Sequence, residues 1–334
     1  MEKKLVTKTG TFIIRPYTEE DEEKVMDLWE AAFLHKIDKK VWRWKFSNAT
    51  FDRQIMLSVN EEGLPVAMYA GIAFDANYKG RDIKMTQLID NMTHPDYRQS
   101  TSGRKGLFVQ TGEYFFKKYA NKSNSILQYG FPGKIAYRLG KLLLEYISID
   151  DCGAYLSTEV KNIKPASFLN FGSVQKVNSA SNDFDHLWES AKKHYPLIVK
   201  RNRAFIQWRF FENPIHKYTI YTYKNFIGKI LAYVVLSIKG DVATIVDIFS
   251  IPRRNTVQSI IKKIKADLLL MNISGLQVWM PRHHFNTEYL IQMSFEVKEE
   301  PLGITPVCRS FDPSLEFEYA KQNIYYTMAD GDLF

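Results

Sequence analysis

Apolar and polar positions in the first 46 residues change period, from the alternation of a strand to the spacing of helices. Phe12–Arg15 alternates as a short strand does. Thr18 and Asp21 then have the three-residue spacing of a capping box, which opens helices. The apolar positions that follow lie on one helical face: Val25, Leu28, Trp29 and Ala32. We therefore expect one helix from Thr18 through Phe33 and a second that ends near Phe46.

The pattern up to residue 150 continues with alternating strands and helices. Two apolar runs, Gln54–Val59 and Val66–Ala73, flank Gly63 as the arms of a hairpin flank a turn glycine. The remaining expected elements are a strand at Met85–Met92, a helix at Gly106–Tyr119, a strand at Ile126–Tyr129, a helix at Lys134–Gly140 and a strand near Leu144–Ile149.

The second half of the chain repeats landmarks of the first half in the same order. Trp44-Lys45-Phe46 matches Trp208-Arg209-Phe210, and a hairpin with a turn glycine follows each. The segments Asp90–Pro95 and Asp247–Pro252 share their Asp-to-Pro spacing, and Gln128–Pro132 and Gln277–Pro281 share their Gln-to-Pro spacing. Because four matches keep one order, we interpret them as a duplication.

The repeat predicts two α/β domains, each a mixed, mostly antiparallel sheet flanked by helices. We place the N-terminal domain at residues 1–182 and the C-terminal domain at residues 196–334. A polar helix-like segment at Asn182–Pro196 joins them. A chain of 334 residues is long enough for two domains of ordinary size.

Composition narrows the class of protein. Hydrophobic residues make up 45% and charged residues 25%, as in globular proteins. The start of the chain is too polar for a signal peptide, and the longest apolar run, near Ile230–Ile238, is far shorter than the roughly 20 residues of a membrane helix. Only Cys152 and Cys308 are present, so a disulfide scaffold is excluded. We expect a cytoplasmic protein, and its net charge of +8 favours anionic partners.

The chemistry most readable in the sequence lies in the loop between the expected strand at Met85–Met92 and the helix after Gly106. Glycines there let the backbone approach a phosphate closely, and a helix N-terminus offers unpaired amides and a partial positive charge. The basic side chains of Arg98, Arg104 and Lys105 reinforce that field. The residues therefore predict a diphosphate site.

This segment resembles the cofactor motif of the GNAT acyltransferase superfamily, in which a strand and a Pro-containing turn lead to Arg or Gln, two residues, Gly, one residue, and Gly or Ala. His94-Pro95-Asp96-Tyr97-Arg98 matches the approach, and Gly106-Leu107-Phe108 matches the helix entry. Seven residues separate Arg98 from Gly106 where the motif has two, so either a stretch is inserted or Gly103 takes the Arg/Gln place. Phe108 stands where the motif has a small residue.

The resemblance implies an acyl-CoA-dependent N-acyltransferase, with acetyl-CoA or another acyl-CoA as co-substrate and direct attack in a ternary complex. The implied cofactor-binding residues are Met92, Thr93, Arg98, Gly103, Arg104, Lys105, Gly106, Leu107 and Phe108. The matching segment of the second half, Arg253–Val257, enters its helix without a glycine. We therefore expect one intact and one degenerate copy.

The resemblance also points to two candidates for proton transfer. Tyr137 follows Gly130-Phe131-Pro132 near the position of the family's tyrosine acid, although packing beside Leu139 is an equal alternative. Asp90 lies where several members carry a catalytic acid, but the repeat keeps Asp247 at the same place, which favours a structural task. Asp330 and Asp332 lie near the end of the chain, where we expect a frayed tail. The seven histidines show no metal spacing.

Three functions stay open from the sequence. The first is acyl transfer to a primary amine of a small molecule or sugar, with no membrane or nucleic-acid partner. The second is an aminoacyl-tRNA-dependent ligase, because those peptidyltransferases also pair two GNAT-like domains, although no long heptad stretch is present here. The third is a non-catalytic binding protein that kept the fold and lost the chemistry.

Overall fold

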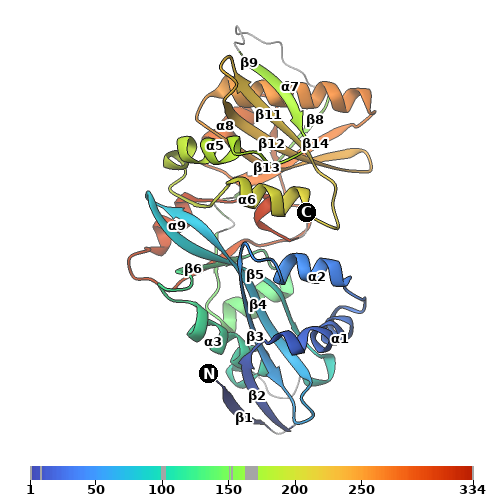
Figure 1. Cartoon of the computed structure of the whole chain (residues 1–334), viewed down its shortest axis with the longest axis vertical. Helices are drawn as coiled ribbons and strands as arrows, with labels where there is room; N and C mark the ends of the chain where they lie inside the picture. The colour runs from blue at the N-terminus through green and yellow to red at the C-terminus, as the bar shows by residue number, and fades with distance from the viewer. Residues whose placement is uncertain are drawn as a thin grey trace. The chain divides into compact units, whose positions relative to one another are not determined.

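The chain forms two compact units (Figure 1). The computed structural model describes residues 2–7, 10–98, 103–149, 151, 153–161 and 172–332; Cys152 and the loop residues 99–102 lie outside this part. Unit 1 comprises Met1–Phe74, Lys84–Ser148 and Ile304–Phe317. Unit 2 comprises Asp75–Ile83, Ile149–Gly303 and Glu318–Phe334.

Unit 1 is built on a sheet with the strand order β1-β2-β3-β4-β5-β6-β16-β7. The pair β5–β6 is parallel, whereas β1–β2, β2–β3, β3–β4, β6–β16 and β16–β7 are antiparallel. The strands are β1 Lys3–Thr7, β2 Gly10–Pro16, β3 Asp52–Val59, β4 Pro65–Tyr78, β5 Arg81–Thr93, β6 Leu127–Gly130, β7 Ile147–Ser148 and β16 Val307–Ser310. The helices are α1 Glu22–Phe33, α2 Lys39–Phe46, α3 Leu107–Tyr119 and α4 Lys134–Leu143.

Helix α3 packs on one face of this sheet through large buried side chains. Phe115 of α3 contacts the ring of Tyr69 on β4, with 5.1 Å between ring centroids. A Cβ atom on Gly112 would lie 3.0 Å from the ring of Tyr69, so glycine lets the helix approach the strand without displacing that ring. A buried hydrogen bond of 2.7 Å joins Thr111 to Ser58 of β3. The helix that carries the predicted cofactor loop is therefore fixed to the sheet along its length.

The predicted capping box at the start of the first helix is present. The Asp21 carboxylate accepts the Thr18 backbone N–H at 2.8 Å and both terminal nitrogens of Arg15 at 2.7 Å. Burial raises the pKa of Asp21, but the hydrogen bonds from Arg15 and Thr18 outweigh it, so the pKa lies below the usual 3.8. The charged form of Asp21 therefore stabilises the fold at neutral pH.

We expect Asp21→Ala to lower the free energy of unfolding by about 2 kcal/mol at pH 7. Because the folded-state pKa of Asp21 is lowered, its contribution is present above about pH 4 and is lost as the pH falls further. Urea unfolding at pH 7 and pH 3 measures this difference. Asp38→Ala is the matched control, since Asp38 accepts the Lys40 N–H at the start of α2 but is exposed. An Asp21→Ala deficit that is equal at both pH values would contradict this assignment.

Unit 2 repeats the arrangement with a sheet in the order β15-β8-β14-β13-β12-β11-β9. Its central pair β13–β14 is parallel, like β5–β6, and one helix, α7, connects the two strands. The strands of this sheet are β8 Gly153–Glu159, β9 Gly172–Val177, β11 Thr219–Asn225, β12 Ile230–Lys239, β13 Val242–Ser250, β14 Gly275–Pro281 and β15 Glu296–Lys298. The remaining elements are α5 Asp183–Ala191, β10 Leu197–Val199, α6 Arg203–Ile206, α7 Arg254–Leu270, α8 Phe285–Ile291, α9 Phe317–Asn323 and β17 Ile324–Tyr325.

The two sheets exchange one strand. β8, which follows β7 in sequence, pairs with β14 and β15 in unit 2. β16, which follows β15 in sequence, pairs with β6 and β7 in unit 1. Each exchanged strand is hydrogen-bonded on both edges, so neither sheet is left with an open edge at that position. The same strand position is thus filled in both copies, each time by the other half of the chain.

This exchange changes the domain boundaries expected from the sequence. The predicted domains, 1–182 and 196–334, follow the chain, whereas the compact units interleave it. The expected junction at Asn182–Pro196 lies inside unit 2, where Phe184, Leu187 and Trp188 of α5 are buried. The predicted fold class holds: both units have mixed sheets flanked by helices, in the same order of elements.

Candidate functional site

The short strand β6 pairs with only part of the longer parallel strand β5. Their register joins Met85–Gln87 to Leu127–Tyr129. A side chain at Gly130 would lie 3.4 Å from the Leu88 carbonyl oxygen, so the strands are still close at that level. β6 ends at Gly130, and just beyond it the Pro132 carbonyl accepts a hydrogen bond from the Thr305 N–H at 3.0 Å. β5 continues to Thr93. The last residues of β5 therefore extend past the end of its parallel partner β6.

The predicted catalytic Asp90 lies in this extension, at an irregular point of β5. Its φ of 55° is in the left-handed region, which non-glycine residues rarely adopt. The next residue, Asn91, accepts the Ala70 N–H of β4 with its side-chain oxygen at 2.7 Å, in place of a backbone carbonyl. Backbone strain of this kind costs on the order of 1–3 kcal/mol and gathers at functional sites. Asp90 thus marks a point where the backbone of β5 departs from regular strand geometry.

The Asp90 carboxylate is held in a buried ion pair. Lys45 of α2 donates to both of its oxygens, at 3.0 and 3.1 Å, and the two side chains are 5% and 8% exposed. The Lys45 ammonium also lies 5.5 Å from the ring of Trp29 on α1. Sequence reasoning did not find Lys45, although it stands in the repeated Trp-Lys-Phe motif. The pair gives Asp90 a structural task, and its predicted role as a proton acceptor stays a prediction.

The segment after β5 is fixed by side-chain contacts. The ring of Tyr97 packs edge-on against Phe12 with 5.7 Å between centroids. Arg98 donates to the Thr93 carbonyl at 3.2 Å and to the Ala32 carbonyl, at the end of α1, at 3.1 Å. Its guanidinium therefore fastens the end of β5 to α1, a different use from the phosphate contact predicted for it. The next four residues lie outside the described part of the chain.

The start of α3 has the features of an anion site. Its N-cap is Gly106, which offers no side chain to the first-turn amides. The preceding turn, Gly103–Lys105, begins at a glycine with φ 62° and carries two exposed basic side chains, Arg104 and Lys105. Uncapped amides at the N-terminus of a 13-residue helix, with cations beside them, favour a bound anion. The phosphate contact expected from the sequence at this helix start stays a prediction.

The other predicted cofactor residues have mixed surroundings. Leu107 and Met92 are buried, and Phe108 packs against Tyr69 with 5.6 Å between centroids. The buried hydroxyl of Thr93 has no hydrogen-bond partner among the described residues. A buried, unsatisfied hydroxyl at the end of β5 fits a polar ligand at this point. The residues present therefore fit a coenzyme that carries phosphates.

Tyr137 lies in the second turn of α4. It is half-buried, and its ring packs against the core cluster that contains Phe115 and Tyr146. The Lys141 ammonium lies 5.9 Å from its ring. Both interpretations made from the sequence, a tyrosine at the site and a tyrosine that packs, are compatible with this position.

In unit 2, tyrosine side chains of the same unit form hydrogen bonds with the backbone of β13 where this strand extends past β14. β13 pairs with β14 only through Val242–Ile245 and then runs on to Ser250. The Tyr195 hydroxyl donates to the Ser250 carbonyl at 2.9 Å and accepts the Ser250 N–H at 3.0 Å. The Tyr325 hydroxyl donates to the Ile248 carbonyl. Backbone groups at the end of β13 are therefore satisfied by buried tyrosine side chains.

A buried charge cluster next to these tyrosines was not found from the sequence. Arg201, 0% exposed, donates to Asp247 at 3.1 Å and also to Asp330. Asp247 further accepts from the Tyr233 hydroxyl at 2.7 Å and the Thr327 hydroxyl at 2.8 Å. The end of the chain is therefore bound into unit 2 at Asp330, and the expected frayed tail was wrong there. The structural task inferred for Asp247 is present.

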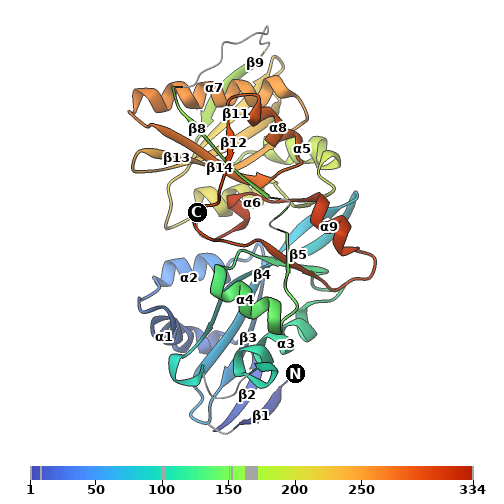
Figure 2. The same ribbon diagram turned by 180° about the vertical axis from the view of Figure 1, so that it is seen from behind.

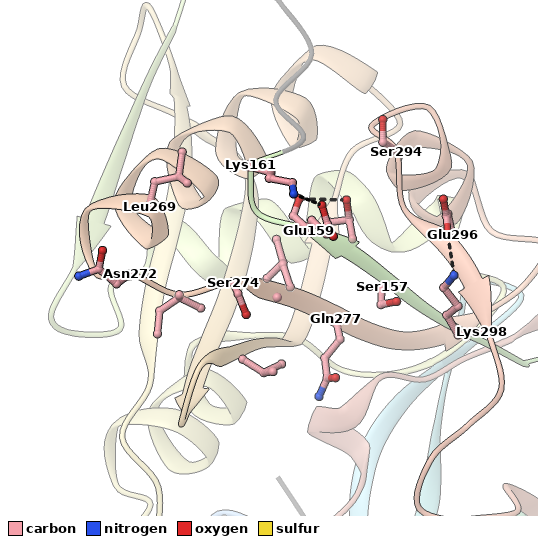
Figure 3. Close-up of a pocket in the computed structure, with 15 residues that line it drawn as sticks. Ser157, Glu159, Lys161, Leu269, Asn272, Ser274, Gln277, Ser294, Glu296 and Lys298 are labelled. Atoms are coloured by element: carbon pink, nitrogen blue, oxygen red, sulfur yellow. Dashed lines mark hydrogen bonds and ion pairs between the residues drawn. The ribbon is translucent and has the colours of Figure 1, made fainter.

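Unit 2 also carries a polar pocket of about 940 Å³ at the start of β14 (Figure 3). Its charged residues are already paired, Lys161 with Glu159 at 3.0 Å and Lys298 with Glu296 at 2.6 Å.

No group of three or more His, Cys, Asp or Glu side chains that could hold a metal occurs in the part of the chain that the structure describes. Within the same part, no helix has the length and apolar character needed to cross a bilayer.

Comparison with known proteins relates a segment of unit 1 to a protein family. A family model for the acetyltransferase (GNAT) domain matches residues 13–140. This span is similar to the GNAT domain and makes up less than half of the chain. It contains β5, the uncapped start of α3 and most of α4. No curated protein matches the sequence.

Solved structures extend the GNAT likeness to both units. A probable N-acyltransferase of unknown function from Enterococcus faecalis is 13% identical, with a TM-score of 0.67 over 90% of this chain and 72% of its own. A GCN5-related N-acetyltransferase from Anabaena variabilis is also 13% identical, with a TM-score of 0.66 over 90% and 73%. The N-myristoyltransferase of Saccharomyces cerevisiae, solved with myristoyl-CoA, is 10% identical, with a TM-score of 0.55 over 90% and 79%. The whole chain therefore has a tandem GNAT-like fold.

Proposed function

We propose that the chain is an acyl-CoA-dependent N-acyltransferase that binds its coenzyme in unit 1 only. The observation that carries this proposal is the uncapped, cation-flanked start of α3, beside a strand that extends past its parallel partner. The GNAT family model and the acyltransferase structures that share the fold support it. The acyl group is proposed to be acetyl, and the acceptor a primary amine of a small molecule or sugar.

Unit 1 offers distinct groups for the coenzyme's phosphates. The first-turn amides of α3 would donate to them, and Gly103 lets the turn approach without a side chain. Arg104 and Lys105 would add charge from the same turn. A bound acyl-CoA would supply an acyl group activated as a thioester. Arg98 would act indirectly, because its hydrogen bonds fix the position of the strand end.

Two groups of this chain are proposed to handle protons. The amine acceptor must lose a proton and the leaving sulfur gains one. Tyr137 is proposed to donate from its hydroxyl to the leaving group. Asp90, held by Lys45, is proposed to orient the acceptor amine or to receive its proton at this irregular point of β5. Thiol release from acetyl-CoA, measured with a panel of amino sugars, polyamines and amino acids, tests the activity directly. If none of these acceptors increases thiol release, the proposed activity is contradicted.

For the tyrosine we expect Tyr137→Phe to lower kcat by about a hundredfold with KM for acetyl-CoA nearly unchanged, as for loss of a general acid. The phenyl ring keeps the packing against α3 and removes only the hydroxyl. Tyr114→Phe, at a half-buried tyrosine on α3, is the matched control and should leave kcat unaltered. A kcat within twofold of the wild type in Tyr137→Phe would show that the residue only packs.

A further inference from the structure

Helix α4 presents an apolar stripe to the outside of unit 1. Ile135, Leu139 and Leu142 recur at the three- and four-residue spacing that places side chains on one helix face. They are 81%, 47% and 71% exposed. Gly140 turns the opposite face inward against the ring of Tyr146, where any side chain would collide. Figure 2 shows α4 on the surface of unit 1, so this stripe is not part of the core.

A basic stripe runs beside the apolar one. Lys134, Arg138 and Lys141 share a neighbouring face of the same helix, and all three are exposed. None of them forms an ion pair within the described part of the chain. The helix itself contains no acidic residue. The nearby Glu145 is engaged by Arg309 at 2.8 Å.

From this arrangement we propose that α4 docks on an anionic phospholipid surface. An amphipathic helix with apolar residues on one face and Lys or Arg beside them lies in the plane of a membrane interface, with its apolar side chains at the acyl boundary. The three cations complement lipid phosphates, and the net charge of +8 adds long-range attraction. Docking of this kind differs from the sequence prediction of no membrane partner, and it needs no spanning helix.

The expected contribution of each stripe differs. The apolar stripe gives insertion, which depends little on salt, and each cation near an anionic surface adds about 1 kcal/mol, or about a fivefold gain in affinity. A purely electrostatic contact would need only the cations. Loss of binding upon removal of Ile135 and Leu142 therefore distinguishes docking through α4 from attraction by net charge.

Vesicle co-sedimentation of the full chain tests the proposal. Vesicles of phosphatidylcholine with one quarter phosphatidylglycerol are compared with phosphatidylcholine alone. We expect binding to the anionic vesicles, lowered at least about tenfold in Ile135→Ser/Leu142→Ser. Lys134→Gln/Arg138→Gln should lower it about twenty-five-fold, fivefold for each charge. Val6→Ser, at an apolar side chain 71% exposed elsewhere in unit 1, should bind as the wild type.

Each alternative result overturns the proposal. Binding that survives Ile135→Ser/Leu142→Ser would show attraction by net charge, and no binding to anionic vesicles would exclude docking. Self-association of the wild type in gel filtration that the same double variant abolishes would assign the stripe to a second copy of the chain. Thermal unfolding of each variant verifies that it is folded. Because Ile135 and Leu142 are exposed, their substitution should leave the unfolding temperature unchanged.

Discussion

Replacing Arg201 by methionine is expected to lower the free energy of unfolding by about 4 kcal/mol, the largest stability effect of any substitution considered for this chain. Arg201 is completely buried and neutralises two buried carboxylates, those of Asp247 and Asp330. Methionine fills a similar volume but leaves both acids without their cation. A buried charge without a partner cannot regain the hydration that it lost on folding.

Urea unfolding followed by tryptophan fluorescence measures this loss. Lys224→Met is the matched control, because Lys224 pairs with Asp183 in the same unit at 3.6 Å but both side chains are partly exposed. A pair of that kind contributes about 0–1 kcal/mol. If Arg201→Met and Lys224→Met cost the same, the cluster would not hold unit 2 together, and the tail at Asp330 would be only loosely attached.

The second large effect is expected at the start of α3. Arg104→Glu/Lys105→Glu should weaken acetyl-CoA binding at least about a hundredfold, since two favourable charges at a diphosphate become two unfavourable ones. Both side chains are exposed, so the substitution leaves the core intact. Isothermal titration with acetyl-CoA gives the affinity directly.

The matched control for this charge reversal lies at the other end of the same helix. Lys117→Glu/Lys118→Glu changes the net charge of the chain by the same amount, in the last turn of α3. It should leave acetyl-CoA affinity within about threefold, because charges more than a Debye length of roughly 10 Å away are largely screened. Equal losses in both double variants would mean that net charge, not the helix start, attracts the coenzyme.

Much of the fold was readable from local patterns. The capping box at Thr18 and Asp21, the hairpin around Gly63 and the helix after Gly106 are all present where the periodicity placed them. These elements depend on neighbours a few residues apart. The exchange of β8 and β16 depends instead on which sheet edge a strand meets, and alternation of apolar residues carries no information on its partner.

The site shows the same division. The glycines and cations near the start of α3 predict an anion site from the sequence, because the residues concerned lie in one short segment. The Lys45–Asp90 pair joins residues 45 positions apart, and Arg201 meets Asp330 across 129 positions. The tyrosines that occupy the extension of β13 looked like ordinary core residues in the sequence. The missing glycine after Pro252 predicts a degenerate second copy, and the contacts of Tyr195 and Tyr325 with the backbone of β13 are compatible with that prediction.

The number of coenzyme molecules bound by each chain tests the central claim most directly. Titration of the full chain with acetyl-CoA should give one site, and the Arg104→Glu/Lys105→Glu substitution should remove it. Two equivalent sites, or one site that keeps its affinity in that variant, would place the coenzyme somewhere other than the start of α3. Absence of any binding by the wild type would contradict the proposal altogether.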